Sequence, residues 1–244
     1  MHPRIALVTG AARGIGRAIA QRLAADGCRV VLTDTDEGAG REAAEATGSA
    51  AEFLPCDVAD ETQVRALCHT VQQRHGRIDV LVNNAGITRD AVIWKMSSAD
   101  FDRVIAVNLK GAWLLCREVA PVMRAQNDGR IINIASRGWL GNFGQSNYGP
   151  SKGGLVSLTR VLALELGRHN VLVNAVAPGA IDTPMLQAME PAARERLREA
   201  QPTHCFGEPG DVAHAVSFLA DPRTCFITGQ TIYVDGGKSI GAGV

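Results

Sequence analysis

The sequence predicts an α/β protein built on a doubly wound parallel sheet of seven strands, with helices on both faces. Short apolar runs alternate along the whole chain with longer stretches of helical periodicity. Strands that are separated by helices favour a parallel sheet covered on both sides. Glycine, asparagine and aspartate follow several of the strands, which is typical of a ligand site at the carboxyl ends of such a sheet.

The elements follow in chain order from these two periodicities. We expect strands at Ile5–Thr9, Arg29–Thr33, Ala51–Pro55, Ile78–Val82, Arg130–Ala135, Val171–Ala177 and Thr231–Val234. We expect helices at Gly14–Asp26, Glu37–Thr47, Glu61–His75, Ser98–Gln126, Tyr148–Arg168, Pro191–Ala200 and Pro209–Ala220. No repeat or Pro/Gly-rich linker divides the chain, so we expect a single domain over residues 1–244.

Composition excludes several classes of function. The 244 residues carry 25 basic and 25 acidic side chains, so nothing favours binding to nucleic acid or to an anionic membrane. The 6 cysteines are scattered, so we expect reduced thiols and no metal site. We find no signal-peptide layout and no apolar run near the ~20 residues of a membrane span, and therefore expect a cytoplasmic protein.

A glycine-rich turn, Thr9–Gly16, follows the first expected strand and opens the first helix. Glycine permits a tight turn and lets the backbone approach a pyrophosphate, and a helix N-terminus offers free N–H groups to phosphates. Such turns occur in many α/β proteins, but this position after a strand favours a dinucleotide site. Its expected members are Gly10, Arg13, Gly14, Ile15 and Gly16.

Asp34 closes the second expected strand and matches the acidic residue that binds an adenosine ribose. The alternative is a turn or helix-cap aspartate. At the ribose, its carboxylate would repel a 2′-phosphate by roughly 1–4 kcal/mol at about 4 Å. Arg13 could instead bind that phosphate, or pair with Asp34 or Asp36. We therefore favour NAD over NADP as the cofactor.

Two further strand ends carry candidate cofactor contacts. Asp57 and Val58 follow the third expected strand, where a side chain can meet the adenine. Asn84, Ala85 and Gly86 follow the fourth and can pack against the cofactor. Ordinary turn chemistry uses the same residue types and is the alternative for both segments.

Tyr148 and Lys152 are one helical turn apart on one face of an expected helix. A phenol ordinarily titrates near ~10. An ammonium about 4 Å away would favour the phenolate by roughly 4 kcal/mol, or up to roughly 3 pKa units. The pair predicts a tyrosine that serves as general acid/base near neutral pH. The alternative is a surface pair with a coincidental spacing.

Together these motifs resemble the short-chain dehydrogenase/reductase family in its single-domain form, over nearly the whole chain. The resemblance rests on Thr9–Gly16, Asn83–Gly86, Asn108, Ser136, Tyr148, Lys152, Pro178-Gly179 and Asp235-Gly236-Gly237. It implies a Rossmann fold and an oxidoreductase that moves a hydride between a nicotinamide cofactor and a secondary alcohol or ketone.

The resemblance also implies roles for single residues. Tyr148 would exchange a proton with the substrate oxygen, and Ser136 would donate a hydrogen bond to that oxygen. Lys152 would lower the pKa of Tyr148 and bind the nicotinamide ribose. Asn108 would hold a water connected to Lys152. The nicotinamide end of the cofactor would meet Pro178, Gly179, Ile181 and Thr183.

Two features depart from the family pattern. The interval from Ser136 to Tyr148 is one residue shorter than in many members, and Gly149-Pro150 replaces small non-proline residues. Proline is tolerated in a first helical turn, so we expect the helix to begin close to Tyr148. The resemblance further implies a homotetramer or homodimer that packs through the two long helices.

The segments expected to face the substrate are rich in apolar residues, namely Trp94, Trp139, Phe143, Met185, Leu186, Met189 and Phe206. They favour a largely apolar substrate portion, with core or subunit-interface positions as the alternative. Arg137 either meets an anionic group or is solvated. His204 and Cys205 lie where a lid could close, or are structural.

Other functions stay open on this sequence. A 3-oxoacyl-acyl-carrier-protein reductase usually implies NADPH and a basic surface patch, and both Asp34 and the zero net charge argue against it. A 3-hydroxyacyl-CoA dehydrogenase that uses NAD stays open, as does a dehydrogenase for small cyclic or aromatic secondary alcohols or for polyols. A catalytically silent dinucleotide-binding subunit on the same fold is the third alternative.

Overall fold

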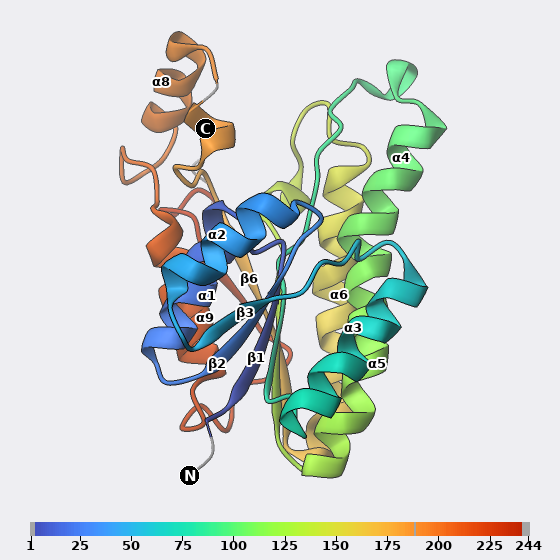
Figure 1. Cartoon of the computed structure of the whole chain (residues 1–244). Coiled ribbons are helices and arrows are strands. Elements are labelled where there is room, and N and C mark those ends of the chain that lie inside the picture. The colour runs from blue at the N-terminus through green and yellow to red at the C-terminus, as the bar shows by residue number, and fades with distance from the viewer. Residues whose placement is uncertain (1–2, 188, 241–244) are drawn as a thin grey trace.

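Seven parallel strands form one sheet at the centre of the computed structural model, which describes residues 3–187 and 189–240 (Figure 1). The strands are β1 (Ile5–Thr9), β2 (Arg29–Thr33), β3 (Ala51–Phe53), β4 (Val80–Asn83), β5 (Gly129–Ile134), β6 (Val171–Pro178) and β7 (Thr231–Val234). Their order is β3-β2-β1-β4-β5-β6-β7, and every neighbouring pair is parallel. The predicted doubly wound sheet is confirmed.

Helices cover both faces of this sheet. They are α1 (Gly14–Ala25), α2 (Glu37–Thr47), α3 (Glu61–His75), α4 (Ser98–Ile105), α5 (Gly111–Gln126), α6 (Tyr148–Leu166), α7 (Pro184–Gln187), α8 (Pro191–Glu199) and α9 (Pro209–Ala220). Helices α1, α2 and α9 pack on one face, and α3, α5 and α6 pack on the other (Figure 1). Helix α8 stands away from the sheet and buries none of its residues.

The two larger apolar cores result from the alternation of side chains along the strands. In β1, Ile5 and Leu7 join the core under α3, α5 and α6, whereas Ala6 and Val8 join the core under α1, α2 and α9. Strand β1 lies between β2 and β4. The chain runs from β1 through β2 to β3 at one edge, then returns to β4 beside β1 and continues to β7 at the other edge. This change of direction leaves a crevice at the carboxyl ends of β1 and β4.

One predicted helix proves to be divided. The stretch Ser98–Gln126 contains α4, a π-helical turn over Ala106–Lys110, and α5. A π turn widens the helix by one residue and leaves the rod continuous, so apolar periodicity does not reveal it. The short α7 was not predicted. The expected strands Ala51–Pro55 and Ile78–Val82 are shorter or shifted, as β3 and β4.

Helix α6 begins at Tyr148, as predicted. The side chain of Asn147 accepts a hydrogen bond from the backbone N–H of Tyr148 at 2.6 Å and caps the helix. Pro150 is the third residue of α6, inside the first turn, where its missing N–H leaves no intrahelical bond unmade.

No helix in residues 3–187 and 189–240 is long and apolar enough to cross a bilayer. Over the same residues, no three His, Cys, Asp or Glu side chains come together in a way that could bind a metal ion.

Candidate active site

A cleft of about 990 Å³ is lined by residues that follow β1, β2, β4, β5 and β6. It therefore lies beyond the carboxyl ends of these strands. The cleft brings together Gly10, Arg13, Gly14, Ile15, Gly16, Asp34, Asp57, Val58, Asn84, Ala85, Gly86, Ser136, Tyr148, Lys152, Pro178, Gly179, Ile181 and Thr183. These are all the predicted cofactor contacts and all but one of the predicted catalytic residues. The exception, Asn108, is fully buried.

The glycine turn has the backbone shape that a phosphate site needs. Gly10 and Gly14 have φ of +60° and +54°, which side chains rarely allow. A Cβ on Gly10 would lie 2.8 Å from the Cα of Ala85, and a Cβ on Gly16 would lie 2.2 Å from the carbonyl oxygen of Gly10. Glycine at these positions lets the turn fold tightly against β4 and exposes the start of α1 to the cleft.

Polar bonds tie this turn to the end of β4. The hydroxyl of Thr9 accepts hydrogen bonds from the backbone N–H groups of Asn84 and Ala85, each at 3.0 Å. The amide of Asn84 donates in return to the carbonyl oxygens of Thr9 and Gly10, each at 2.9 Å. The two strand ends that flank the crevice are thereby held in one arrangement.

Asp34 is engaged with the backbone around it. One carboxylate oxygen accepts from the N–H of Ala12 at 3.1 Å, and the other accepts from Thr35 at 2.8 Å and Asp36 at 3.2 Å. Arg13 pairs with Asp36 rather than with Asp34. Asp34 and Asp36 both line the cleft after β2, and the contact of Asp34 with a ribose stays a prediction.

Asp57 and Val58 lie beside the π turn and α5. Asp57 accepts a hydrogen bond from Arg103 of α4 at 3.0 Å and one from the N–H of Ala59 at 2.9 Å. Val58 is buried, and a Cβ on Gly111 would lie 2.8 Å from its side chain. Arg103 lines the cleft as well and was not predicted, because no motif marks it.

Tyr148 and Ser136 share a hydrogen bond in the cleft, which Asp90 also lines. Burial raises the pKa of Tyr148 above its ordinary value, a hydrogen bond with Ser136 lowers it, and the charge of Asp90 raises it. The prediction that Tyr148 has a lowered pKa is therefore wrong for the groups that this chain supplies. The spacing of Tyr148 and Lys152 could not reveal the desolvation of the phenol, because that burial depends on tertiary packing.

Lys152 is buried beneath this pair. Its Nζ lies 5.8 Å from the centre of the Tyr148 ring and donates a hydrogen bond to the carbonyl oxygen of Ile134 at 2.7 Å. Burial lowers the pKa of Lys152 to about 8. A Cβ on Gly86 would lie 3.3 Å from Nζ, so the glycine leaves the ammonium room toward the cleft.

Asn108 sits in the π turn and binds the loop above Lys152. Its Oδ1 accepts from the N–H of Ile87 at 2.8 Å, and its Nδ2 donates to the carbonyl of Ile87 and to the hydroxyl of Ser151, each at 3.0 Å. The predicted link through a water to Lys152 stays a prediction. These contacts match the buried, backbone-bound amide that was compatible with it.

The segment after β6 forms another wall of the cleft. Gly179 donates its N–H to Val234 at 2.9 Å, and a Cβ there would lie 2.7 Å from the Cβ of Asp235. Ile181 is buried and pairs with Gly207 in a short parallel bridge. Pro178 and Thr183 complete this wall.

The predicted substrate-facing residues divide between two places. Leu186 and Met189 line the cleft, whereas Trp94, Trp139 and Phe143 line a second hollow. Phe206 lines neither and packs under the guanidinium of Arg194. The side chain of Met185 lies outside the described residues.

The sequence left the roles of Arg137, His204 and Cys205 open between a functional and a structural one. Arg137 donates a hydrogen bond to Asn142 at 3.0 Å and does not line the cleft. His204 adopts a positive φ of 52° and its carbonyl accepts from Arg198, and Cys205 is exposed.

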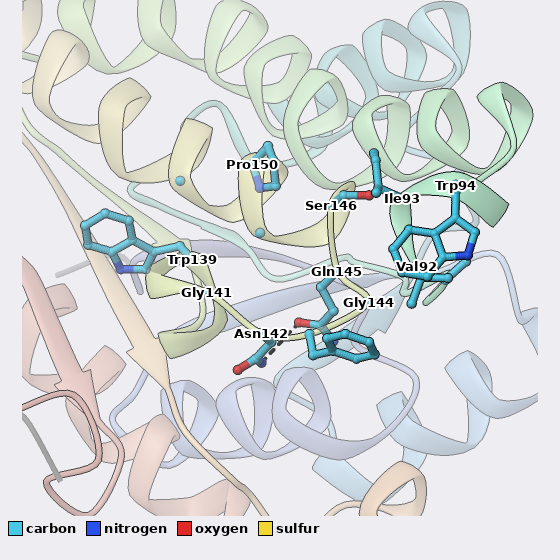
Figure 2. Close-up of a pocket in the computed structure, with 14 residues that line it drawn as sticks. Val92, Ile93, Trp94, Trp139, Gly141, Asn142, Gly144, Gln145, Ser146 and Pro150 are labelled. Carbon is cyan, nitrogen blue, oxygen red and sulfur yellow. Dashed lines mark hydrogen bonds between the residues drawn. The ribbon is translucent and has the colours of Figure 1, made fainter. Parts of the chain in front are cut away.

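The second hollow, of about 460 Å³, lies beside the first turn of α6 (Figure 2). Its walls come from residues 91–94, from residues 139–146 and from the start of α6. Sequence reasoning named three of its side chains and did not foresee that they form a separate cavity.

The sequence model of one family, described as enoyl-(acyl carrier protein) reductase, matches residues 10–239. The chain belongs to the short-chain dehydrogenase/reductase family. This membership makes it an oxidoreductase that acts on CH–OH groups, as its motifs predict.

Similar members of this short-chain dehydrogenase/reductase family include two curated proteins. The (2S)-((R)-hydroxy(phenyl)methyl)succinyl-CoA dehydrogenase subunit BbsD of Thauera aromatica is 43% identical, over 98% of this chain and 98% of its own. The 3-oxoacyl-acyl-carrier-protein reductase FabG of Thermotoga maritima is 43% identical, over 98% and 99%. A solved structure of levodione reductase aligns with a TM-score of 0.91 at 36% identity, over 98% of both chains.

Proposed function

We propose that this enzyme interconverts a 3-hydroxyacyl and a 3-oxoacyl thioester, using NAD and with Tyr148 as the acid/base. The observation that carries the proposal is the pairing of Tyr148 and Ser136 in a cleft that holds every expected dinucleotide contact. The thioester is supported by relatives at 43% identity, whose names describe a CoA thioester and a carrier-protein thioester.

The residues of the cleft fit a nicotinamide dinucleotide. The start of α1 and the glycine turn would hold its phosphates, Asp34 the adenosine ribose, and Lys152 the nicotinamide ribose. When bound, the dinucleotide supplies or accepts the hydride. The open position at Gly14, where a Cβ would meet no backbone within 4 Å, leaves room for the phosphates.

The protein groups move the proton. During reduction, the hydroxyl of Ser136 donates a hydrogen bond to the carbonyl oxygen, and the phenol of Tyr148 gives its proton to the same oxygen as it becomes an alcohol. During oxidation, the phenolate takes that proton back. The raised pKa of Tyr148 keeps the phenol protonated at neutral pH, which suits proton donation.

A Tyr148→Phe variant tests this role. We expect turnover, followed by absorbance of the reduced nicotinamide, to fall by at least about 10²-fold, because phenylalanine keeps the ring and removes the transferable proton. Binding of the dinucleotide, followed by calorimetry, should remain. Turnover within tenfold of the unchanged enzyme would exclude the proposed mechanism, and binding without turnover in the unchanged enzyme would favour the silent subunit.

A secondary alcohol or ketone without a thioester is the second candidate. It is favoured by the structural likeness to levodione reductase and by the apolar side chains of Ile87, Leu186 and Met189 in the cleft. Comparing kcat/KM for a 3-oxoacyl-CoA, a 3-oxoacyl carrier protein and a cyclic ketone distinguishes the candidates. A preference for the cyclic ketone would overturn the thioester proposal.

The choice of NAD rests on Asp34, whose carboxylate would repel a 2′-phosphate. We expect Asp34→Ser to lower the ratio of kcat/KM for NAD to that for NADP by about tenfold or more. Glu42→Ser, at an exposed position of α2 outside the cleft, is the matched control. A preference of the unchanged enzyme for NADP would contradict the choice.

A further inference from the structure

Arg103 brings a positive charge from the last turn of α4 into the lining of the cleft. Its side chain is half exposed, and its Nη2 donates a hydrogen bond to Oδ2 of Asp57 at 3.0 Å. The two residues are 46 positions apart, so the pair forms only when α4 lies against the loop after β3. An exposed ion pair of this kind contributes little to stability. Its place in the cleft points instead to a role in binding.

The carboxylate of Asp57 is held from two sides. Its Oδ1 accepts a hydrogen bond from the backbone N–H of Ala59 at 2.9 Å, while its Oδ2 accepts from Arg103. The N–H of Asp57 donates to Oε1 of Gln63 at 2.9 Å, which fixes the backbone of the same residue. A carboxylate has about four acceptor positions on its two oxygens, so a ligand in the cleft can bind beside these donors.

The side chains next to this carboxylate are apolar. Val58 and Val107 are 5% and 7% exposed, and both line the cleft. A Cβ on Gly111 would lie 2.8 Å from Cγ2 of Val58, so the start of α5 packs closely against that valine and holds it in place. Apolar walls beside one fixed acceptor suit a flat heteroaromatic ring that carries an amino group at its edge.

The guanidinium of Arg103 determines how well this acceptor discriminates. A charged hydrogen bond restricts the rotation of the Asp57 carboxylate and so fixes the directions in which its oxygens accept. A fixed carboxylate binds an amino group and repels a carbonyl oxygen in the same position. Without Arg103, the carboxylate is free to turn toward water, and both kinds of ring then bind with more similar affinity.

We propose that Arg103 is a positioning residue that sets the selectivity of the cleft for adenine, by holding Asp57 where it accepts a hydrogen bond from the 6-amino group of that base. The inference rests on the proposed function, because it takes the ligand of the cleft to be a nicotinamide adenine dinucleotide. It adds to the cofactor site a residue that no sequence motif marks.

NAD and nicotinamide hypoxanthine dinucleotide test the inference. The second compound has an oxygen at position 6 of the purine in place of the amino group, and the rest of the dinucleotide is the same. Titration calorimetry without substrate measures the dissociation constant of each. We expect the unchanged enzyme to bind NAD about tenfold more tightly or better, since hypoxanthine loses the charged hydrogen bond and places an oxygen against the carboxylate.

Three variants separate the contributions to this preference. Arg103→Met keeps an unbranched side chain and removes the guanidinium, so we expect the preference to fall to about threefold or less. Arg103→Lys should retain most of the preference, because an ammonium can replace the donating Nη2. Asp57→Asn should abolish the preference, because its amide can donate to the oxygen of hypoxanthine.

Arg65→Met is the matched control. Arg65 belongs to α3, pairs with Glu61 at 3.3 Å and lies outside the cleft lining, so its loss should leave the preference unchanged. An unchanged preference in Arg103→Met would overturn the inference. An equal weakening of both dinucleotides would also overturn it, because an arginine that only supports the fold acts on both alike. Equal binding of the two by the unchanged enzyme would have the same meaning.

Binding without substrate separates this inference from the proposed function. Selective binding of NAD that depends on Arg103, in an enzyme that turns over no thioester, would refute the proposed function and support the inference. Turnover of a thioester by an enzyme that binds both dinucleotides alike would refute the inference alone.

Discussion

Among single residues, the buried ammonium of Lys152 is expected to lower stability at neutral pH. Its pKa falls from 10.5 to about 8 on folding. Below about pH 8 both the folded and the unfolded chain hold the proton, and burying the charge lowers stability. Between about pH 8 and pH 10.5 the unfolded chain binds more protons than the folded chain, so the free energy of unfolding rises with pH.

We therefore expect Lys152→Met to raise the free energy of unfolding at pH 7 by about 2 kcal/mol. The relief of charge burial, about 3 kcal/mol, exceeds the loss of the bond to Ile134, about 1 kcal/mol. Urea unfolding at pH 7 and pH 10 measures the difference between the two proteins, which should shrink at the higher pH. An equal difference at both values would contradict the argument.

Single residues also show where sequence reasoning succeeds and where it stops. The gathering of the expected cofactor contacts in one cleft was predictable because parallel strands bring their carboxyl ends to one edge, so motifs that are distant in sequence meet there. The raised pKa of Tyr148 was not, since it depends on burial and on Asp90. Arg103 and the second hollow were missed for the same reason: only tertiary contacts define them.

Among the secondary-structure elements, the start of α6 positions Tyr148. Pro150 and Asn147 contribute unequally to the stability of this first turn. Pro150 restricts the unfolded chain, so Pro150→Ala should lower the free energy of unfolding by about 0.4–1 kcal/mol. Asn147 is fully buried, caps the helix, and donates a hydrogen bond from its amide to the backbone carbonyl oxygen of Arg89 at 2.8 Å. Asn147→Ala should lower the free energy of unfolding by about 2 kcal/mol or more. Thermal unfolding that ranks Pro150→Ala as the more harmful change would contradict this account.

Apolar periodicity located most elements to within a few residues because most helices and strands bury one face or two. It could not separate α4 from α5, since the π turn over Ala106–Lys110 preserves the apolar stripe of the rod. It also missed α7, which at four residues is too short to show a period.

For the molecule as a whole, the predicted oligomer would pack through apolar residues of the two long helices that are exposed on the single chain. Val104, Leu114 and Leu155 of the long helices are buried within the chain itself. Val161 and Leu164 of α6 are 47% and 87% exposed. These exposed residues are better candidates for a contact between copies. The single domain over residues 1–244 and the cytoplasmic location also stay predictions.

Leu164→Glu tests the contact. A carboxylate in an apolar interface is costly to desolvate, so we expect the mass measured by light scattering to fall to that of a smaller assembly. Glu165→Gln, at an exposed neighbouring position of the same helix, should leave the mass unchanged. A monomeric unchanged protein, or a variant of unchanged mass, would refute this contact.

The bonds between Thr9 and Asn84 have a consequence for the order in which the chain acquires its abilities. They join residues 75 positions apart, and they form only once β1 has paired with β4 across the intervening α1, β2, α2, β3 and α3. Closing so long a loop is a late, non-local event in folding. A nascent chain that ends before β4 would carry the whole glycine motif without the bonds that hold it against β4. Recognition of a dinucleotide would thus select chains whose central sheet is complete and, by mass action, protect them from reopening.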